Sequence, residues 1–273
     1  MTLKAVFIGA GSMAEAIIAG ALKSGALQAE NTYVTNQDNL ARLKELTTQY
    51  GIQAGYDVET ALKDADVIVL AMKPKDAASG LEAIRPYINE DSVVISLLAG
   101  VGINFMEQII GKRCAVIRSM PNTSAAVGKS ATAMALNKRV TAEQHQAAID
   151  LFSAIGLAIT VEESQMDAVT AISGSGPAYI YYVAEAMQAA GEELGLDHDT
   201  AKSLLIQTLL GAADMLSESD GQAVALRKAI TSAGGTTEAA IRTFDEHHVK
   251  ESIAAGVKEA ASQSKRLGEA YKR

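Results

Sequence analysis

The chain has 273 residues, which is near the upper limit for one hydrophobic core, so its length predicts two compact units. Hydrophobic residues make up 48% of the chain and charged residues 21%, as in globular proteins, which excludes long disordered stretches. The net charge of −8 disfavours a protein that binds nucleic acid or an anionic membrane surface, because both classes rely on clustered Lys and Arg.

The first predicted element is a strand within Leu3–Ile8. This apolar run is far shorter than the ~20 residues of a membrane span and has no basic leader, so we expect neither a span nor a signal peptide. Unbroken apolar runs predict a parallel sheet that is buried on both faces, with crossover helices between its strands. Four more such runs are predicted strands: Thr32–Val34, Val67–Leu70, Val93–Ile95 and Ala115–Ile117.

Residues Gly9 to Ala14 follow the first predicted strand and have the pattern G-x-G-x-x-A at the start of a predicted helix. In such a loop, Gly9 permits the tight turn, Gly11 lets the backbone approach a pyrophosphate, and Ala14 keeps the helix close to the strand. The N–H groups at the helix start would bind the phosphates. The pattern predicts dinucleotide binding, although glycines also join strands to helices in α/β proteins that bind no dinucleotide.

The segment after the second predicted strand, Val34-Thr35-Asn36-Gln37, is expected to contact the ribose 2′ position of the cofactor. Thr35 and Asn36 can donate hydrogen bonds to a 2′-phosphate, and the first carboxylate, that of Asp38, comes late. This pattern favours NADP(H). Because no arginine follows immediately, NAD(H) stays an open alternative.

Two further loops follow predicted strands, Ala71–Pro74 and Ser96–Val101. Ligands of open α/β sheets lie beyond the carboxyl ends of the strands, so both loops should face the cofactor. Lys73 could offset the charge of a phosphate or carboxylate, or be a solvated lysine in front of a helix. Met120–Thr123 has a comparable position, and its polar groups suit either a nicotinamide amide or an ordinary turn.

The single cysteine, Cys114, excludes an internal disulfide and is more typical of core packing than of a nucleophile. A single cysteine fits a reducing compartment, so we expect a cytoplasmic protein. No acidic or imidazole side chains have metal-ligand spacing near a predicted strand end, so we expect no metal site.

The hydrophobic pattern changes at about Glu163, where β-branched runs stop and a period of about 3.6 residues begins. We therefore predict a dinucleotide-binding domain over 1–162 and an all-helical domain over 163–273. Wide apolar faces on the predicted helices suggest a homodimer that buries them. The predicted helices run over 177–194, 199–217, 221–231, 235–246 and 248–271.

Two segments of the second half combine glycine with hydroxyl side chains, Ser173–Tyr179 and Ser232–Glu238. Each precedes a predicted helix, whose free N–H groups would form a site for a small anion such as a carboxylate. For the first segment, a simple N-cap by Ser175 with Pro177 in the first turn is an alternative. The absence of a nearby His or Asp pair disfavours acyl transfer and indicates binding and orientation instead.

Together these motifs resemble the pyrroline-5-carboxylate reductase family. The similarity runs from about Val6 to Leu267 and is most specific in the serine-glycine-proline and glycine-glycine-threonine-threonine segments. It implies a Rossmann-like N-terminal domain and a helical C-terminal dimerisation domain. It also implies reduction of (S)-1-pyrroline-5-carboxylate to L-proline by NAD(P)H, the last step of proline biosynthesis, in a homodimer or a higher oligomer of dimers.

The resemblance also implies which residues act. Since a cyclic imine is already electrophilic, we expect positioning to be the main catalytic device, with the Thr237 hydroxyl bound to the ring nitrogen. The implied cofactor contacts are Gly9, Ala10, Gly11, Ser12, Met13, Asn36, Ala71, Lys73, Pro74, Ala99 and Gly100. The implied substrate contacts are Glu163, Ser175, Ser232, Gly234, Gly235, Thr236 and Thr237.

Three positions depart from the family pattern. Gln37 stands where an arginine often follows Asn36, which weakens the preference for NADP(H). Ser124 and Ala233 each replace a frequent proline, and Ala233 loosens the loop before Gly234 by removing a fixed backbone angle.

Two rival functions are weighed against this one. A hydroxyacid or sugar-acid dehydrogenase with the same domain plan usually has a catalytic lysine on a helix, and the helix predicted after Ser175 has none. A nucleotide-sensing regulator without turnover would not need a second anion-binding loop, so the two hydroxyl-rich segments favour an enzyme.

Overall fold

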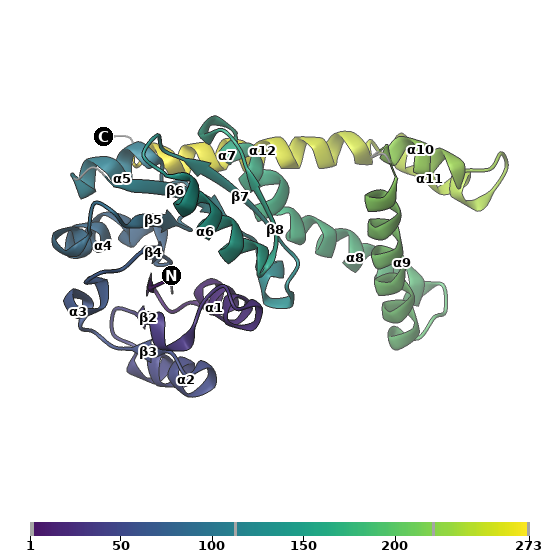
Figure 1. Ribbon diagram of the computed structural model, residues 1–273. Coiled ribbons are helices and arrows are strands. Elements are labelled where there is room, and N and C mark those ends of the chain that lie inside the picture. The colour runs from purple at the N-terminus through teal and green to yellow at the C-terminus, as the bar shows by residue number, and fades with distance from the viewer. Residues whose placement is uncertain (1–2, 112–113, 220–221, 272–273) are drawn as a thin grey trace. The chain divides into compact units, whose positions relative to one another are not determined.

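The chain forms two compact units in the computed structural model, which describes residues 3–111, 114–219 and 222–271 (Figure 1). The first unit comprises Met1–Pro177 together with Lys258–Arg273, and the second comprises Ala178–Val257. The first unit extends past the predicted boundary at 162/163 because the short helical turns that follow Glu163 pack on the sheet. A functional division at that boundary stays a prediction.

The described residues of the first unit form an eight-stranded sheet with the order β3-β2-β1-β4-β5-β6-β7-β8. All neighbouring strands are parallel except β6 and β7, which are antiparallel. The strands are β1 (Ala5–Ile8), β2 (Thr32–Thr35), β3 (Gln53–Ala54), β4 (Val67–Leu70), β5 (Val93–Ser96), β6 (Ala115–Met120), β7 (Ser130–Leu136) and β8 (Gly156–Thr160).

The five predicted strands are confirmed as β1, β2, β4, β5 and β6, whereas three others were not predicted. β3 has only two residues, and β7 contains small residues in place of a β-branched run. β8 is largely exposed, so it lacks the apolar signature of a buried strand. A one-turn 3₁₀ helix, Thr123–Val127, joins β6 to β7, and no crossover helix lies between them, so this pair runs antiparallel.

Successive residues of β1 point to opposite faces of the sheet and enter two separate cores. Ala5 and Phe7 pack with side chains from α1, α2 and α6, whereas Val6 and Ile8 pack with side chains from α3, α4 and α5. The sheet is thus covered on both faces, as in Rossmann-type folds (Figure 1). These helices are α1 (Ser12–Ser24), α2 (Leu40–Tyr50), α3 (Val58–Leu62), α4 (Ala77–Ile84), α5 (Ile103–Ile110) and α6 (Ala142–Ser153).

The second half of the chain is helical, as predicted, and its helices lie within a few residues of the predicted ranges. Residue 221, where one of them is predicted to begin, lies outside the described residues. None of the described helices is long and apolar enough to span a membrane. The helices are α8 (Gly176–Glu193), α9 (His198–Glu218), α10 (Ala223–Ala229), α11 (Thr236–Glu246) and α12 (Val249–Glu269).

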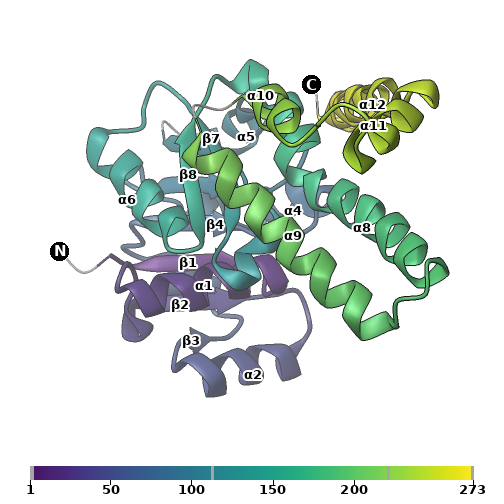
Figure 2. The same cartoon turned by 90° about the vertical axis from the view of Figure 1, so that its right-hand side faces the viewer.

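The second unit buries little of its own apolar surface. Among its described residues, Ala201 and Leu205 of α9 are the buried hydrophobic ones. α8 and α9, which a short turn at Gly195 joins (Figure 2), expose large side chains along their length. The exposed residues on these two helices include Ile180, Tyr181, Tyr182, Met187, Leu204, Ile206, Leu210 and Met215.

Candidate functional site

The predicted dinucleotide loop joins β1 to α1 at the carboxyl end of the strand. Gly9 has a φ of +123°, and a β-carbon at this residue would lie 2.4 Å from the carbonyl oxygen of Ala71. Only glycine fits here, because both the backbone angle and the close approach exclude a side chain. The predicted strand–loop–helix context is therefore confirmed, and the loop after β1 lies against the loop after β4.

Gly11 faces open space at the start of α1. A β-carbon at this residue would meet no atom within 4 Å, and no side chain caps the helix. No capping side chain therefore accepts a hydrogen bond from the first N–H groups of α1. Uncapped N–H groups at a helix start can bind a phosphate. Ala14 is fully buried, so α1 packs closely on the sheet as expected.

Asn36 closes the turn between β2 and α2. Its Nδ2 donates to the carbonyl oxygen of Asn39 at 2.8 Å, and its Oδ1 accepts from the Asn39 N–H at 2.8 Å. Asn39 in turn caps α2 by accepting from the Arg42 N–H at 3.0 Å. An amide nitrogen carries two hydrogens, so Asn36 retains one donor for a ligand while the turn fixes its orientation.

Arg42 is a basic residue near the dinucleotide loop that was not predicted from the sequence. Its Nε donates to the carbonyl oxygen of Ala10 at 3.1 Å, and its guanidinium pairs with Glu15 and, at 2.9 Å, with Glu45. The hydrogen bond from Arg42 holds the pKa of the Glu15 carboxyl below its usual range. The sequence offers no signal for this contact because it joins the first turn of α2 to a loop more than thirty positions earlier.

The loop after β4 is anchored at its first residue, where the Ala71 N–H donates to the carbonyl oxygen of Ile8 at 2.8 Å. Lys73 is exposed and precedes the 3₁₀ turn Pro74–Asp76. This position suits both interpretations of Lys73, a partner for an anion or a solvated side chain.

Asn122 contributes to the structure of its loop. Its side chain is nearly buried, caps the following turn by accepting from the Ser124 N–H at 3.1 Å, and donates to the carbonyl oxygen of Ser173 at 2.9 Å. Its own N–H donates to the Ser130 hydroxyl at 3.1 Å. Of the two functions weighed for Met120–Thr123, the structure therefore favours turn formation over binding of a nicotinamide amide.

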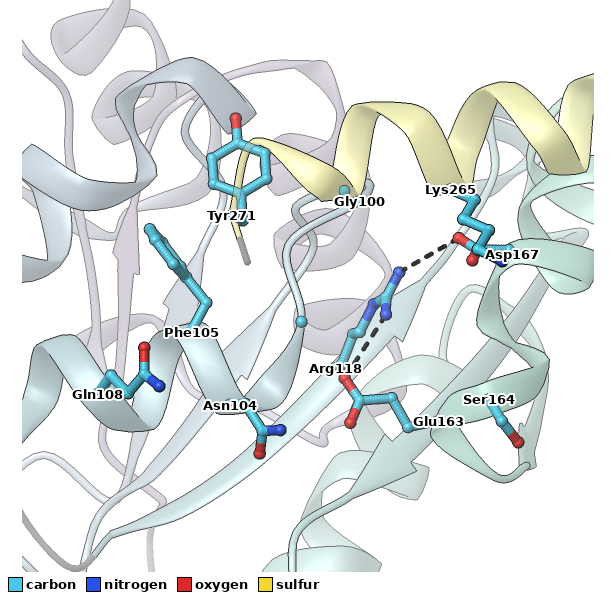
Figure 3. Close-up of a pocket in the computed structure, with 12 residues that line it drawn as sticks. Gly100, Asn104, Phe105, Gln108, Arg118, Glu163, Ser164, Asp167, Lys265 and Tyr271 are labelled. Atoms are coloured by element: carbon cyan, nitrogen blue, oxygen red, sulfur yellow. Dashed lines mark ion pairs between the residues drawn. The ribbon is translucent and has the colours of Figure 1, made fainter. Parts of the chain in front are cut away.

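A cavity of about 460 Å³ lies beyond Gly100 in the first unit (Figure 3). Arg118 of β6 projects into it and is only 8% exposed, with Glu163 at 3.5 Å and Asp167 at 4.0 Å from its guanidinium nitrogens. The residues that line the cavity are Gly100, Gly102, Asn104, Phe105, Gln108, Arg118, Glu163, Ser164, Asp167, Lys265, Gly268 and Tyr271.

Glu163, one of the implied substrate residues, lies in this cavity. Its Oε1 accepts from the Ile103 N–H at 2.7 Å, at the start of α5, and also pairs with Arg118. A carboxylate at a helix N-terminus is favoured by the helix dipole and by the free N–H groups there. Arg118 was not predicted because it directly follows the predicted strand Ala115–Ile117, and its carboxylate partners come from a segment far along the chain.

The segment Ser173–Tyr179 differs from the prediction. A π-helical turn, Thr170–Gly174, continues α7 (Met166–Val169) into α8, and the Ser175 N–H donates to the carbonyl oxygen of Thr170 at 2.8 Å. The prediction of free N–H groups at a helix start, and the alternative of Ser175 as an N-cap, are therefore wrong.

A proline follows this π-helical turn and leaves one carbonyl oxygen without a helical donor. Pro177, in the first turn of α8, has no N–H to donate to the carbonyl oxygen of Ser173 four residues earlier. Asn122 supplies that missing donor with its side-chain amide. π-helical turns often occur at functional sites, and here the turn ties the loop after β6 to the start of α8.

The loop before α11 belongs to the second unit and has the predicted form. Gly234 has a φ of +72°, and Gly235 caps the helix without a side-chain hydrogen bond. Thr236 and Thr237 are the first two residues of α11, at the end where N–H groups lack helical partners. The Glu238 carboxylate accepts from the Gly234 N–H at 2.7 Å and holds the loop, a contact that was not predicted.

The structure thus gathers the implied cofactor residues along one edge of the first unit, at the carboxyl ends of β1, β2, β4 and β5. The implied substrate residues from Ser232 to Thr237 form a separate loop in the second unit. Among the residues that the structure describes, no three His, Cys, Asp or Glu side chains are grouped as a metal ion would require.

Two family models match separate parts of the chain, one in each half. Residues 163–267 match the family model described as pyrroline-5-carboxylate reductase dimerisation. Residues 4–100 match the model described as NADP oxidoreductase, coenzyme F420-dependent.

Similar proteins cover nearly the whole chain. The chain is 47% identical over 265 residues to pyrroline-5-carboxylate reductase 2 of Bacillus subtilis (strain 168), with 97% of this chain and 95% of the relative covered. The pyrroline-5-carboxylate reductase structure from Coxiella burnetii matches with a TM-score of 0.90 and 37% identity, over 98% of this chain and 99% of that one. The Plasmodium falciparum pyrroline carboxylate reductase with NADP bound matches with a TM-score of 0.87 and 29% identity, over 97% and 98%.

Two alanine substitutions separate the roles of the loop glycines. Gly9→Ala should destabilise the fold by about 1–3 kcal/mol, because its β-carbon meets the Ala71 backbone at an unfavourable φ. Gly11→Ala should change stability by less than about 0.5 kcal/mol, yet weaken NADPH binding roughly tenfold or more, because its β-carbon enters the space reserved for the pyrophosphate. Urea unfolding and fluorescence titration measure the two effects. Wild-type affinity in Gly11→Ala would contradict the assignment of the loop.

Proposed function

The chain belongs to the pyrroline-5-carboxylate reductase family, and we propose that it reduces (S)-1-pyrroline-5-carboxylate to L-proline with NADPH, as the last step of proline biosynthesis. The observation that carries this proposal is the open start of α1 at Gly11, two residues after Gly9, which lies against the loop after β4. That geometry suits a dinucleotide, and the 47% identity to a named reductase over nearly the full chain supports the reaction.

The residues of the first unit fit the cofactor. The N–H groups from Gly11 to Met13 would hold the pyrophosphate, the Asn36 amide would meet the ribose phosphate, and the backbone of Ala99 and Gly100 would line the nicotinamide end. Ala10, Ser12, Ala71, Lys73 and Pro74 complete the proposed contact surface. When bound, NADPH supplies the hydride that the reaction consumes.

The cofactor preference that we propose is NADPH, with NADH as a weaker donor. No carboxylate is available at Thr35 or Asn36 to repel a 2′-phosphate, and the Asn36 amide keeps one N–H that can donate to it. The similar Plasmodium falciparum reductase has NADP bound, and the family model over 4–100 is an NADP oxidoreductase model, which supports the same choice.

The loop Ser232–Thr237 is our proposed substrate site, together with Glu163 and Ser175. Backbone N–H groups at Thr236 and Thr237 would bind the substrate carboxylate, beside Gly235, whose own N–H donates to the carbonyl oxygen of Ser232 at 3.0 Å. The Thr237 hydroxyl would accept a hydrogen bond from the protonated ring nitrogen. Because an iminium carbon is already electrophilic, the protein's task is to hold that carbon near the hydride donor. A threonine hydroxyl is a weak acid, so the ring nitrogen is protonated by water or before binding.

A direct assay tests the reaction. Purified chain mixed with NADPH and pyrroline-5-carboxylate should consume NADPH, as measured by its absorbance, and release an equal amount of L-proline. A parallel assay with NADH should give a lower kcat/KM. If NADPH is bound but never oxidised in the presence of the imine, the chain is a nucleotide-binding protein without this activity.

Thr237 can be tested by two substitutions. Thr237→Ala should lower kcat about ten- to a hundredfold, since losing one hydrogen bond to a charged group costs about 1.5–3 kcal/mol, while NADPH affinity stays within about twofold. Thr237→Ser keeps the hydroxyl and should restore most of the turnover. Equal rates for the alanine variant and the wild type would exclude the proposed role.

We also propose that the chain is a cytoplasmic homodimer that can assemble into a larger oligomer of dimers. The exposed apolar side chains of α8 and α9 form a surface that one subunit leaves uncovered, and the dimerisation family model covers these helices. A single cysteine, which can form no disulfide within the chain, supports a reducing compartment. The proposed domains are 1–162 for the cofactor and 163–273 for substrate binding and dimerisation.

The dimer has its own test. Leu204→Glu introduces a charge on the exposed apolar surface of α9 and should shift the sedimentation coefficient from dimer to monomer. Lys202→Gln, which changes the charge by the same amount two residues away on the same helix, should leave the dimer intact. A monomeric wild type, or a dimeric Leu204→Glu variant, would contradict the proposed interface.

A further inference from the structure

The last turns of α12 lie directly on the loop that follows β5. A β-carbon at Gly268 would lie 2.9 Å from the carbonyl oxygen of Gly100, and one at Gly100 would lie 3.3 Å from the Gly268 nitrogen. Gly100 also has a φ of +78°, which favours glycine. Figure 3 shows Gly100 beside the end of this helix. Two glycines therefore permit a backbone-to-backbone contact between α12 and a residue proposed to meet the nicotinamide.

Two further contacts hold the end of α12 in this place. The buried Ser264 hydroxyl donates to the Asp167 carboxylate at 2.7 Å. Tyr271, just after the helix, packs edge-to-face on Phe105 of α5 with ring centroids 5.1 Å apart. The contact at Gly268 therefore lies between a hydrogen bond on one side and an aromatic pair on the other.

The opposite end of the same loop is also fixed. The Glu163 carboxylate accepts from the Ile103 N–H, where the loop enters α5, and Arg118 pairs with Glu163 and with Asp167. Asp167 thus joins two contacts, the ion pair with Arg118 and the hydrogen bond from Ser264 of α12. Since Arg118 is nearly buried, this charged cluster is costly to break once formed.

We infer that Gly268 is a positioning residue for the nicotinamide end of the cofactor, acting through the Gly100 carbonyl. This inference rests on the proposed function. A side chain at Gly268 would meet a backbone atom at a distance that real β-carbons do not adopt, so either the loop or the helix must move. Hydride transfer depends on how accurately the nicotinamide is placed against the substrate. A shift of the loop at Gly100 should therefore affect the reaction more than the fold.

The test is Gly268→Ala in the full-length chain, with Gly256→Ala as the matched control. Gly256 lies on the same helix, and a β-carbon there would meet no atom within 4 Å. Gly268→Ala should lower kcat at least about tenfold and weaken NADPH binding, while its affinity for 2′,5′-ADP stays within about twofold. That probe carries the adenosine end of the cofactor and lacks the nicotinamide, so it does not reach Gly100. Gly256→Ala should match the wild type in all three measurements.

Three outcomes would overturn the inference. They are wild-type kcat in Gly268→Ala, equal losses of affinity for NADPH and 2′,5′-ADP, or the same losses in Gly256→Ala. If Gly268→Ala does not fold, Ser264→Ala removes the neighbouring hydrogen bond to Asp167 and should produce the same pattern to a smaller degree. Unchanged kcat in that variant would then refute the inference. An inactive wild type would refute the proposed function instead, because NADPH and 2′,5′-ADP binding can be measured without turnover.

Discussion

At the carboxyl end of β1, the α-carbon of Gly9 lies so close to the Ala71 carbonyl that no side chain fits between them. This approach follows from the parallel pairing of β1 with β4, because parallel neighbours end at the same edge of a sheet. It brings the loop after β1 against the loop after β4 and leaves the first N–H groups of α1 facing open space beside Gly11. The other proposed cofactor residues extend from this point along the same edge, toward Asn36 on one side and Gly100 on the other.

Two arginines near this edge hold loops in place. Arg42 ties α2 to the Ala10 carbonyl, and Arg118 gathers Glu163 and Asp167 beneath the loop after β5. Each guanidinium joins segments that are far apart in the sequence, with carboxylates that neutralise it. The two arginines thus help to hold the loops in which the proposed chemistry takes place.

Much of the fold is predictable from local sequence because its signals are local. Short β-branched or apolar runs identify β1, β2, β4, β5 and β6, and the glycine pattern identifies the loop after β1. β7 and β8 escape prediction because small residues and an exposed edge remove the apolar signature. The site is less predictable, since Arg42, Arg118 and Gly268 act through tertiary contacts that no spacing reveals. The π-helical turn at Thr170–Gly174 is a similar case, because Asn122, from another strand end, supplies the hydrogen bond that Pro177 cannot.

A crystal structure of the chain with bound NADPH would test the proposed cofactor site most directly. The pyrophosphate should lie within hydrogen-bonding distance of the N–H groups at Gly11 to Met13, with the nicotinamide ring beside Ala99 and Gly100. A nucleotide bound elsewhere on the chain, or one whose nicotinamide points away from Gly100, would contradict the proposed site.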